Sequence, residues 1–289
     1  MQTDVTVYAV PVFILSLFLE HYFAKKEGMV IHQWKDSLAS IGMGVGSLVI
    51  GVGMKLLAFT VMLYLYEFRL FELPMTTWWT WILLLFADDF VFYWHHRLSH
   101  QVRILWAAHV NHHSSQQYNL AVALRQSWGE VIYKYTFWMI LPLIGFHPIA
   151  VMIMIGINLV YQFFPHTKLV GKLGVLEYIM NTPSHHRVHH ASNVRYLDKN
   201  HAGIFIIWDR LFGTFQPELK EEPVVYGITA NIDSHNVFYI ASHEYISLWK
   251  DVKRAPRFSD KLKYLFYPPG WSHDGENLTS RYLQAKLVD

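Results

Sequence analysis

Cysteine is absent from this 289-residue chain, and charged residues make up only 16% of it. Without cysteine there is no disulfide framework, no iron–sulfur cluster, no haem–thiolate and no thiol nucleophile. The hydrophobic share of 53% excludes a disordered chain, and a net charge of only +2 makes nucleic acid an unfavourable partner. Histidine is the residue in excess, with 18 copies, so the chemistry of the protein should be sought there.

Long apolar runs predict an all-α integral membrane protein. A membrane span needs roughly 20 apolar residues, and four runs approach or exceed this length: residues 5–24, 38–66, 76–95 and 133–164. The last run holds Pro142, Gly145 and Pro148 and is expected to form a helical hairpin that turns near Gly145. No basic residue precedes the first run, which therefore predicts a retained helix and not a cleaved signal peptide. We expect one domain over residues 1–289 with about four to five membrane segments.

The basic residues orient these segments. Lys25, Lys26 and Lys35 lie between the first two runs, whereas residues 67–75 carry only Arg69. The positive-inside bias then places the N-terminus outside and the first loop in the cytoplasm. Following the chain through the remaining runs places the stretch after residue 95 and the tail, residues 217–289, in the cytoplasm as well, where they are predicted to form a helical cap.

Small residues recur at a spacing of four in the second run. Gly42 is followed by Gly46, and Ser47 by Gly51. A phosphate-binding glycine loop needs a preceding strand and a third glycine at position 47, and both are missing. The pattern instead favours close packing of a membrane helix against its neighbours.

Three histidine boxes carry the strongest chemical signal. The first is H-x-x-x-H and the other two are H-x-x-H-H, and residues three or four apart share one face of a helix. Neutral imidazole is a good ligand for iron, copper or zinc. Eight such ligands are too many for one ion and suit two. The box residues are His96, His100, His109, His112, His113, His186, His189 and His190.

Three other residues are weaker candidates. His166 stands alone after the fourth run, and His185 abuts the third box but breaks its spacing; either is a candidate for an additional ligand. Asp89 lies seven residues before His96 near the end of an apolar run. Because this spacing puts both on roughly one helix face, Asp89 is a candidate to accept a hydrogen bond from a ligand imidazole.

The boxes and their flanking residues resemble the fatty acid hydroxylase/sterol desaturase superfamily of membrane di-iron enzymes. The matching segments are Asp89–Phe90, Tyr93–Arg97, Thr182–His190 and Trp208–Phe215. Within the superfamily the chain is most similar to the alkylglycerol monooxygenase branch. That similarity rests on Ser114–Ser115, Tyr118–Leu120, Ala123–Ser127, Asp198–Asn200, Val225–Gly227 and Pro269–Trp271.

The resemblance implies two iron ions, molecular oxygen, a long-chain membrane lipid as substrate and an external electron donor. The branch uses a tetrahydropteridine as reductant and oxidises the carbon beside an ether oxygen. Three residues depart from the pattern of the branch, because Gln101 and Lys168 stand where Glu is usual and His201 stands where Tyr is usual. The eight box histidines are unaffected by these departures.

The expected function is hydroxylation of a lipid C–H bond. Desaturation by the same centre is the nearest alternative, because nothing in the boxes distinguishes removal of a second hydrogen from delivery of a hydroxyl. A metal-binding membrane protein without oxygenase activity is a further alternative. A zinc hydrolase is disfavoured, because the H-E-x-x-H pattern is missing and zinc uses fewer ligands. The oligomeric state is not encoded in these patterns.

Overall fold

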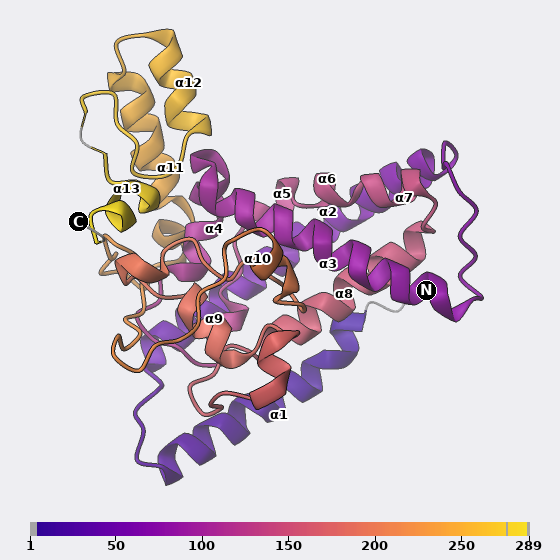
Figure 1. Cartoon of the computed structure of the whole chain (residues 1–289), viewed down its shortest axis with the longest axis horizontal. Coiled ribbons are helices and arrows are strands. Elements are labelled where there is room, and N and C mark those ends of the chain that lie inside the picture. Colours follow the sequence, from indigo (N-terminus) through magenta and orange to yellow (C-terminus); the bar gives the residue numbers. More distant parts are fainter. Residues whose placement is uncertain (1–4, 276, 288–289) are drawn as a thin grey trace.

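The computed structural model describes residues 5–275 and 277–287. The described residues form helices and loops and contain no strand, only three isolated bridges. The predicted all-α class is therefore confirmed. Figure 1 shows α1 (Val5–Lys26) along the lower edge of the view, with α3 (Trp78–Gln101) above α8 (Pro148–Phe163).

Two described helices have the length and apolar composition of a membrane span. They are α1 (Val5–Lys26) and α2 (Trp34–Tyr66). Most of their side chains face outward, including Phe18 at 70% and Val49 at 71% exposure. An apolar helix with so little of its surface covered is suited to lipid and not to water. The two helices thus indicate a membrane protein. The number of membrane segments and their orientation across the membrane stay predictions.

The third apolar run forms α3 (Trp78–Gln101), which continues six residues beyond the predicted end at residue 95. The first histidine box therefore lies on the same continuous helix as the apolar run. Val102 takes an extended conformation and ends α3, and α4 (Arg103–His113) follows at once. This short joint brings the second box back against the end of α3.

The short helix α5 (Glu130–Tyr133) leads into the fourth run. The run itself forms two more short helices, α6 (Tyr135–Trp138) and α7 (Ile140–Ile144), and then the longer α8 (Pro148–Phe163). The turn falls at Gly145, where sequence placed it, with φ of 134°. A Cβ there would lie 2.2 Å from the carbonyl oxygen of Phe71, so only glycine fits.

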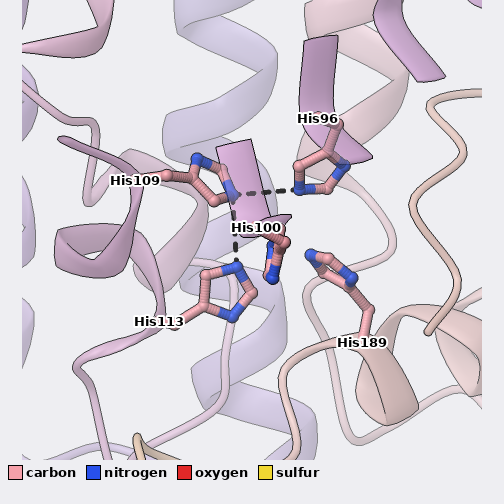
Figure 2. A group of neighbouring side chains, drawn as sticks. All are labelled: His96, His100, His109, His113 and His189. Carbon is pink, nitrogen blue, oxygen red and sulfur yellow. Dashed lines mark hydrogen bonds between the residues drawn. The ribbon is translucent and has the colours of Figure 1, made fainter. Parts of the chain in front are cut away.

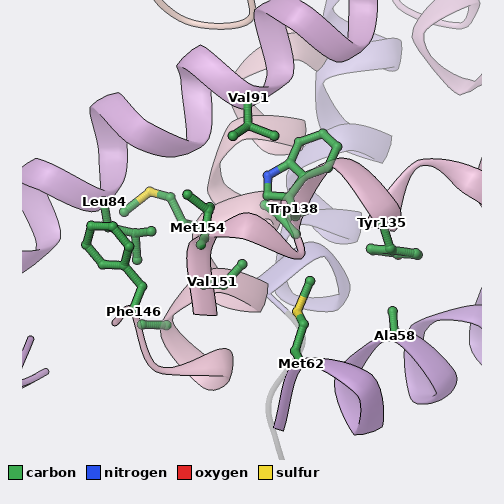
Figure 3. Close-up of a cluster of buried hydrophobic side chains, with 12 residues drawn as sticks. Ala58, Met62, Leu84, Val91, Tyr135, Trp138, Phe146, Val151 and Met154 are labelled. Atoms are coloured by element: carbon green, nitrogen blue, oxygen red, sulfur yellow. The ribbon is translucent and has the colours of Figure 1, made fainter. Parts of the chain in front are cut away.

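The largest hydrophobic core joins α2, α3, α6, α7 and α8 (Figure 3). Leu84 and Met62 are fully buried in it, and Phe146 fills the space beside the turn. This core fixes the direction of α3, and α3 in turn carries the first histidine box.

Small residues of α2 allow a loop to pack closely against it. A Cβ at Gly46 would lie 2.4 Å from the Trp128 indole ring, whose Nε1–H donates to the Met43 carbonyl oxygen at 2.9 Å. A Cβ at Gly44 would lie 2.6 Å from the Leu124 carbonyl oxygen. The partner of these glycines is thus the segment around η1 (Val122–Leu124), which leads from the second box to α5.

The remaining elements cover the histidine boxes. The short helices η2 (Gly174–Tyr178), α9 (Pro183–His189), η3 (Val194–Tyr196) and α10 (Ile207–Leu211) form a loop-rich layer, and α11 (Val237–Arg254), α12 (Phe258–Phe266) and α13 (Ser280–Ala285) follow. Figure 1 shows α11 and α12 projecting together beyond α4. Arg103 ties α11 to the start of α4 through Glu244 at 3.0 Å and Asp251 at 2.7 Å.

Candidate metal centre

Three helix ends carry the histidine boxes. The last two turns of α3 hold His96 and His100, and α4 holds the second box. The third box lies on α9, with His190 as its C-cap residue. Because the spacing of three or four places the imidazoles of each box on one face, the three faces converge in the interior of the protein.

Five imidazoles from all three boxes form a first group (Figure 2), and their ligand nitrogens lie within 4.8 Å of one another. The ring centroid of His109 is 4.7 Å from His96 and 5.0 Å from His113. That of His189 is 4.4 Å from His96 and 4.7 Å from His113. The His100 ring lies 4.7 to 5.2 Å from each of these four. The other four rings thus form a closed cycle of contacts, and the His100 ring contacts every one of them.

Four imidazoles form a second group, again with ligand nitrogens within 4.8 Å of one another. His166 Nε2 lies 3.2 Å from His112 Nε2 and 3.0 Å from His186 Nε2. The ring of His190 lies 4.6 Å from His112 and 4.8 Å from His186. Four donors leave positions free around a six-coordinate ion. The structure thus brings the lone His166 together with three box residues.

The two groups are adjacent. The His113 ring of the first group stacks on the His190 ring of the second at 4.4 Å. His186 and His189 also stack across the boundary, at 5.2 Å. Two ions held by these groups would therefore lie side by side in the buried interior of the protein.

The outer nitrogen of several rings is held by a main-chain carbonyl. A carbonyl oxygen can only accept, so the imidazole Nδ1 must carry the hydrogen and Nε2 must carry the lone pair. This is the form in which imidazole binds a metal through Nε2. The Nδ1–carbonyl pairs are His96–His201 at 2.8 Å, His189–Lys199 at 2.9 Å, His112–Arg125 at 3.3 Å and His166–Gln162 at 2.8 Å.

Carboxylates face the outer nitrogen of two further rings. Glu130 Oε2 accepts from His109 Nδ1 at 2.9 Å, and Asp198 Oδ1 lies 3.5 Å from His100 Nδ1. Burial alone raises the pKa of Glu130, but attraction to His109 and the hydrogen bond outweigh it and hold the pKa of this carboxyl below its usual value. Glu130 therefore stays ionised and fixes the orientation of His109.

The inner nitrogens fit a bound cation. His96 Nε2 and His109 Nε2 lie 3.0 Å apart, yet both rings carry their hydrogen on Nδ1. Two lone pairs thus face each other in a buried space, where they repel unless a cation lies between them. Among the described residues, Nε2 of His100, His189 and His190 has no hydrogen-bond partner. Nitrogen donors of this kind suit iron, copper or zinc.

Burial and neighbouring rings keep the imidazoles of the third box neutral. The pKa of His186, His189 and His190 lies well below the usual histidine value, first because burial disfavours the charged form and then because the neighbouring rings repel added charge. Metal binding requires neutral imidazole, so these sites need not first lose a proton at neutral pH.

Asp89 and His185 have partners other than a box imidazole. The Asp89 carboxylate accepts from the backbone N–H groups of Ile204 and Phe205 at 2.6 and 2.9 Å and from the Trp208 indole at 3.0 Å. It therefore ties α3 to the loop before α10. His185 helps to cap the start of α9, and its Nε2 lies 3.4 Å from Glu177 Oε2, so it belongs to neither group.

Sequence reasoning missed three residues beside the groups. Glu130 has no sequence pattern that distinguishes it from other acidic residues, and Asp198 stands out only as part of a segment that resembles the family. His201 was noticed only as a departure from a family pattern, yet its ring is fully buried and lies 4.9 Å from that of His100. Its backbone N–H donates to Asp209 Oδ1 at 2.8 Å, which fixes the carbonyl that holds His96.

Comparison with known proteins shows which proteins this chain is similar to. Residues 81–214 match the model of the fatty acid hydroxylase family. The chain is 42% identical over 267 residues to alkylglycerol monooxygenase of Homo sapiens, covering 91% of this chain and 59% of that protein. It is 44% identical over 239 residues to the Xenopus tropicalis protein of the same name, covering 82% and 52%.

A more distant relative is a bacterial lipid hydroxylase. Ornithine lipid hydroxylase OlsE of Rhizobium tropici is 29% identical over 153 residues, covering 52% of this chain and 46% of that protein. The chain thus spans about half the length of the curated relatives it matches. No solved structure matches it.

Proposed function

We propose that this chain, whose residues 81–214 match the model of the fatty acid hydroxylase family, is a membrane enzyme that holds two iron ions and hydroxylates a C–H bond of a long-chain lipid. The observation that carries the proposal is the pair of adjacent imidazole groups, five rings and four. All eight box histidines fall into these groups, and His166 is the ninth member. We assign these nine as the ligands.

Two bound irons would supply the activation of O2 and the removal of hydrogen from carbon. The described residues hold the ions, keep the imidazoles neutral and exclude water. Eight of the nine rings are buried, and only His112 is half-buried, so reactive species are shielded from solvent. The reaction balances with two external electrons and two protons, because one oxygen atom enters the lipid and the other leaves as water.

Ether lipids are the proposed substrates. Relatives from Homo sapiens and Xenopus tropicalis bear the name alkylglycerol monooxygenase, and a hydroxyl placed beside an ether oxygen gives a hemiacetal that breaks down to an aldehyde and an alcohol. A tetrahydropteridine is the proposed electron donor, from the resemblance to this branch. With Lys25, Lys26 and Lys35 between the first two apolar runs, the centre is proposed to face the cytoplasm.

The test is turnover of an alkylglycerol by purified protein in lipid nanodiscs, with products identified by mass spectrometry. A gain of one oxygen, or the aldehyde that follows from it, supports the proposal, whereas a loss of two hydrogens indicates a desaturase. His112→Ala should abolish turnover. His21→Ala is the matched control, because His21 is exposed and belongs to neither group. Full activity of His112→Ala would reject the assignment.

A further inference from the structure

The helices α11 and α12 form a hairpin that stands out beyond α4 (Figure 1). Its inner side is fixed to the protein. Leu248 and Tyr264 are buried in a cluster with Ala107 of α4, and the ion pairs of Arg103 with α11 cross the same junction. The hairpin is therefore held in one orientation, with its outer side exposed.

The outer face of α12 is apolar. Phe258, Leu262 and Phe266 are spaced by four and so share one face of the helix. They are 75%, 40% and 59% exposed, whereas Tyr264 on the opposite face is 5% exposed. Burial of apolar surface is favourable in proportion to its area, so a face with three large exposed apolar side chains is suited to contact with an apolar partner.

The outer side of α11 carries a second apolar stripe. Tyr239, Ile246 and Trp249 are exposed, and their spacing places them on one face of the helix. The Lys253 ammonium lies over the Trp249 ring, 5.0 Å from its centroid. Tryptophan and tyrosine combine an apolar ring with a polar end and are enriched where hydrocarbon meets water. This stripe thus has the composition of a surface that meets a membrane.

Basic residues accompany both apolar faces. The hairpin, residues 237–266, holds six basic and three acidic residues, and each acidic residue lies in an ion pair, two with Arg103 and one with Lys263. Helical periodicity places Lys261 and Lys263 on either side of the apolar face of α12. The hairpin therefore presents positive charge beside apolar surface, a combination that is complementary to anionic lipid. The exposed basic residues near its turn are Lys250, Lys253, Arg254 and Arg257.

The hairpin begins where a membrane helix ends. Ile240 in the first turn of α11 is buried against Ala39 and Met43 of α2. A Cβ at Gly42 would lie 3.0 Å from Val237 Cγ1. These residues of α2 lie at the start of the apolar run 38–66. The first turn of α11 thus lies at the level where this span meets the lipid headgroups.

We propose that the α11–α12 hairpin docks on the anionic lipid surface of the bilayer that α1 and α2 cross. The exposed apolar side chains enter the boundary between headgroups and acyl chains, and the exposed lysine and arginine side chains pair with lipid phosphates and carboxylates. A second copy of this chain is a less favourable occupant, because two surfaces with the same excess of positive charge repel each other. The docking requires neither the metal nor the reaction.

The absence of cysteine allows a site-directed test. Leu262→Cys and, in a second variant, Phe266→Cys place a nitroxide spin label on the apolar face of α12, in the iron-loaded full chain with one chain per nanodisc. Glu221→Cys is the control, because Glu221 is exposed and lies outside the hairpin. Electron paramagnetic resonance measures collision of the label with O2, which is concentrated in lipid, and with a water-soluble nickel chelate. The nanodiscs contain phosphatidylcholine alone or with phosphatidylserine.

With phosphatidylserine, the labels at positions 262 and 266 should collide more with O2 than with nickel, and the label at position 221 more with nickel. Each Lys or Arg near an anionic surface contributes about fivefold. Replacing Lys250, Arg254 and Arg257 together by Gln should therefore lower the ratio of docked to free label about 100-fold. Omission of phosphatidylserine should lower that ratio as well.

Equal access of nickel to all three positions in the presence of phosphatidylserine overturns the proposal. Protection from nickel that persists unchanged without phosphatidylserine and in the triple Gln variant also overturns it, because a second copy or another protein segment would then cover the face. Turnover is not part of the measurement, so either result leaves the proposed function standing.

Discussion

Removal of the Glu130 carboxylate should weaken one metal position and leave the other intact. Glu130 contacts His109 Nδ1 at 2.9 Å, and His109 belongs to the first group only. Loss of such an outer partner costs about 10- to 100-fold in metal affinity, or about 1.4 to 2.8 kcal/mol. Glu130→Ala should therefore lower the affinity of the first group by this factor. Glu130→Gln keeps an oxygen that accepts from Nδ1–H, and its loss should be smaller.

The assay is iron retained per chain after equilibration with a series of chelator concentrations. Glu130→Ala should release one of its irons at a chelator concentration about 10- to 100-fold lower than the unmodified chain requires, and retain the other. Glu244→Ala is the matched control, because Glu244 makes a carboxylate contact of similar length, 3.0 Å, with Arg103 and touches no grouped histidine. Unchanged iron retention in Glu130→Ala, or equal loss in Glu244→Ala, would refute the reasoning.

Three further outcomes are expected. Asp209→Asn should lower the free energy of unfolding by about 1 to 3 kcal/mol, measured by chemical denaturation, because Asp209 accepts from two backbone N–H groups and the Thr214 hydroxyl and an amide supplies only one oxygen. Gly46→Ala should lower the free energy of unfolding by about 1 to 3 kcal/mol, because its added Cβ collides with the Trp128 ring. Gly53→Ala is the control and should leave the free energy of unfolding undiminished, because nothing lies within 4 Å of its added Cβ. Chelation of the metals should lower the midpoint of thermal unfolding, and restored iron should recover it, because a bound metal stabilises the folded state by mass action.

Local patterns predicted the parts of the site that lie on single elements. The spacing within each box determines which histidines share one face of a helix, and this spacing can be read directly from the sequence. The turn at Gly145 was legible for the same reason, since glycine and the following Pro148 are local signals. His166 was identified as a candidate by its isolation at the end of an apolar run, and only the packing of α8 beside α3 brings it to the second group.

The outer partners of the imidazoles could not be predicted from sequence. Four of them are main-chain carbonyls, which every residue possesses. Sequence does not show that Glu130 and Asp198 lie beside His109 and His100, because only folding brings these pairs together. Asp89 is a residue for which the local pattern was misleading. Its spacing to His96 on the helix favoured a contact with that imidazole, but its oxygens instead accept hydrogen bonds from backbone N–H groups of a distant loop.

The central claim is that this chain holds two irons on nine imidazoles. Iron content per chain, with X-ray absorption at the iron edge on protein purified without chelator, tests it most directly. The account predicts about two irons per chain, each with a first coordination shell dominated by imidazole nitrogen, as the two groups of five and four rings require. One metal per chain, or a haem spectrum, would contradict it.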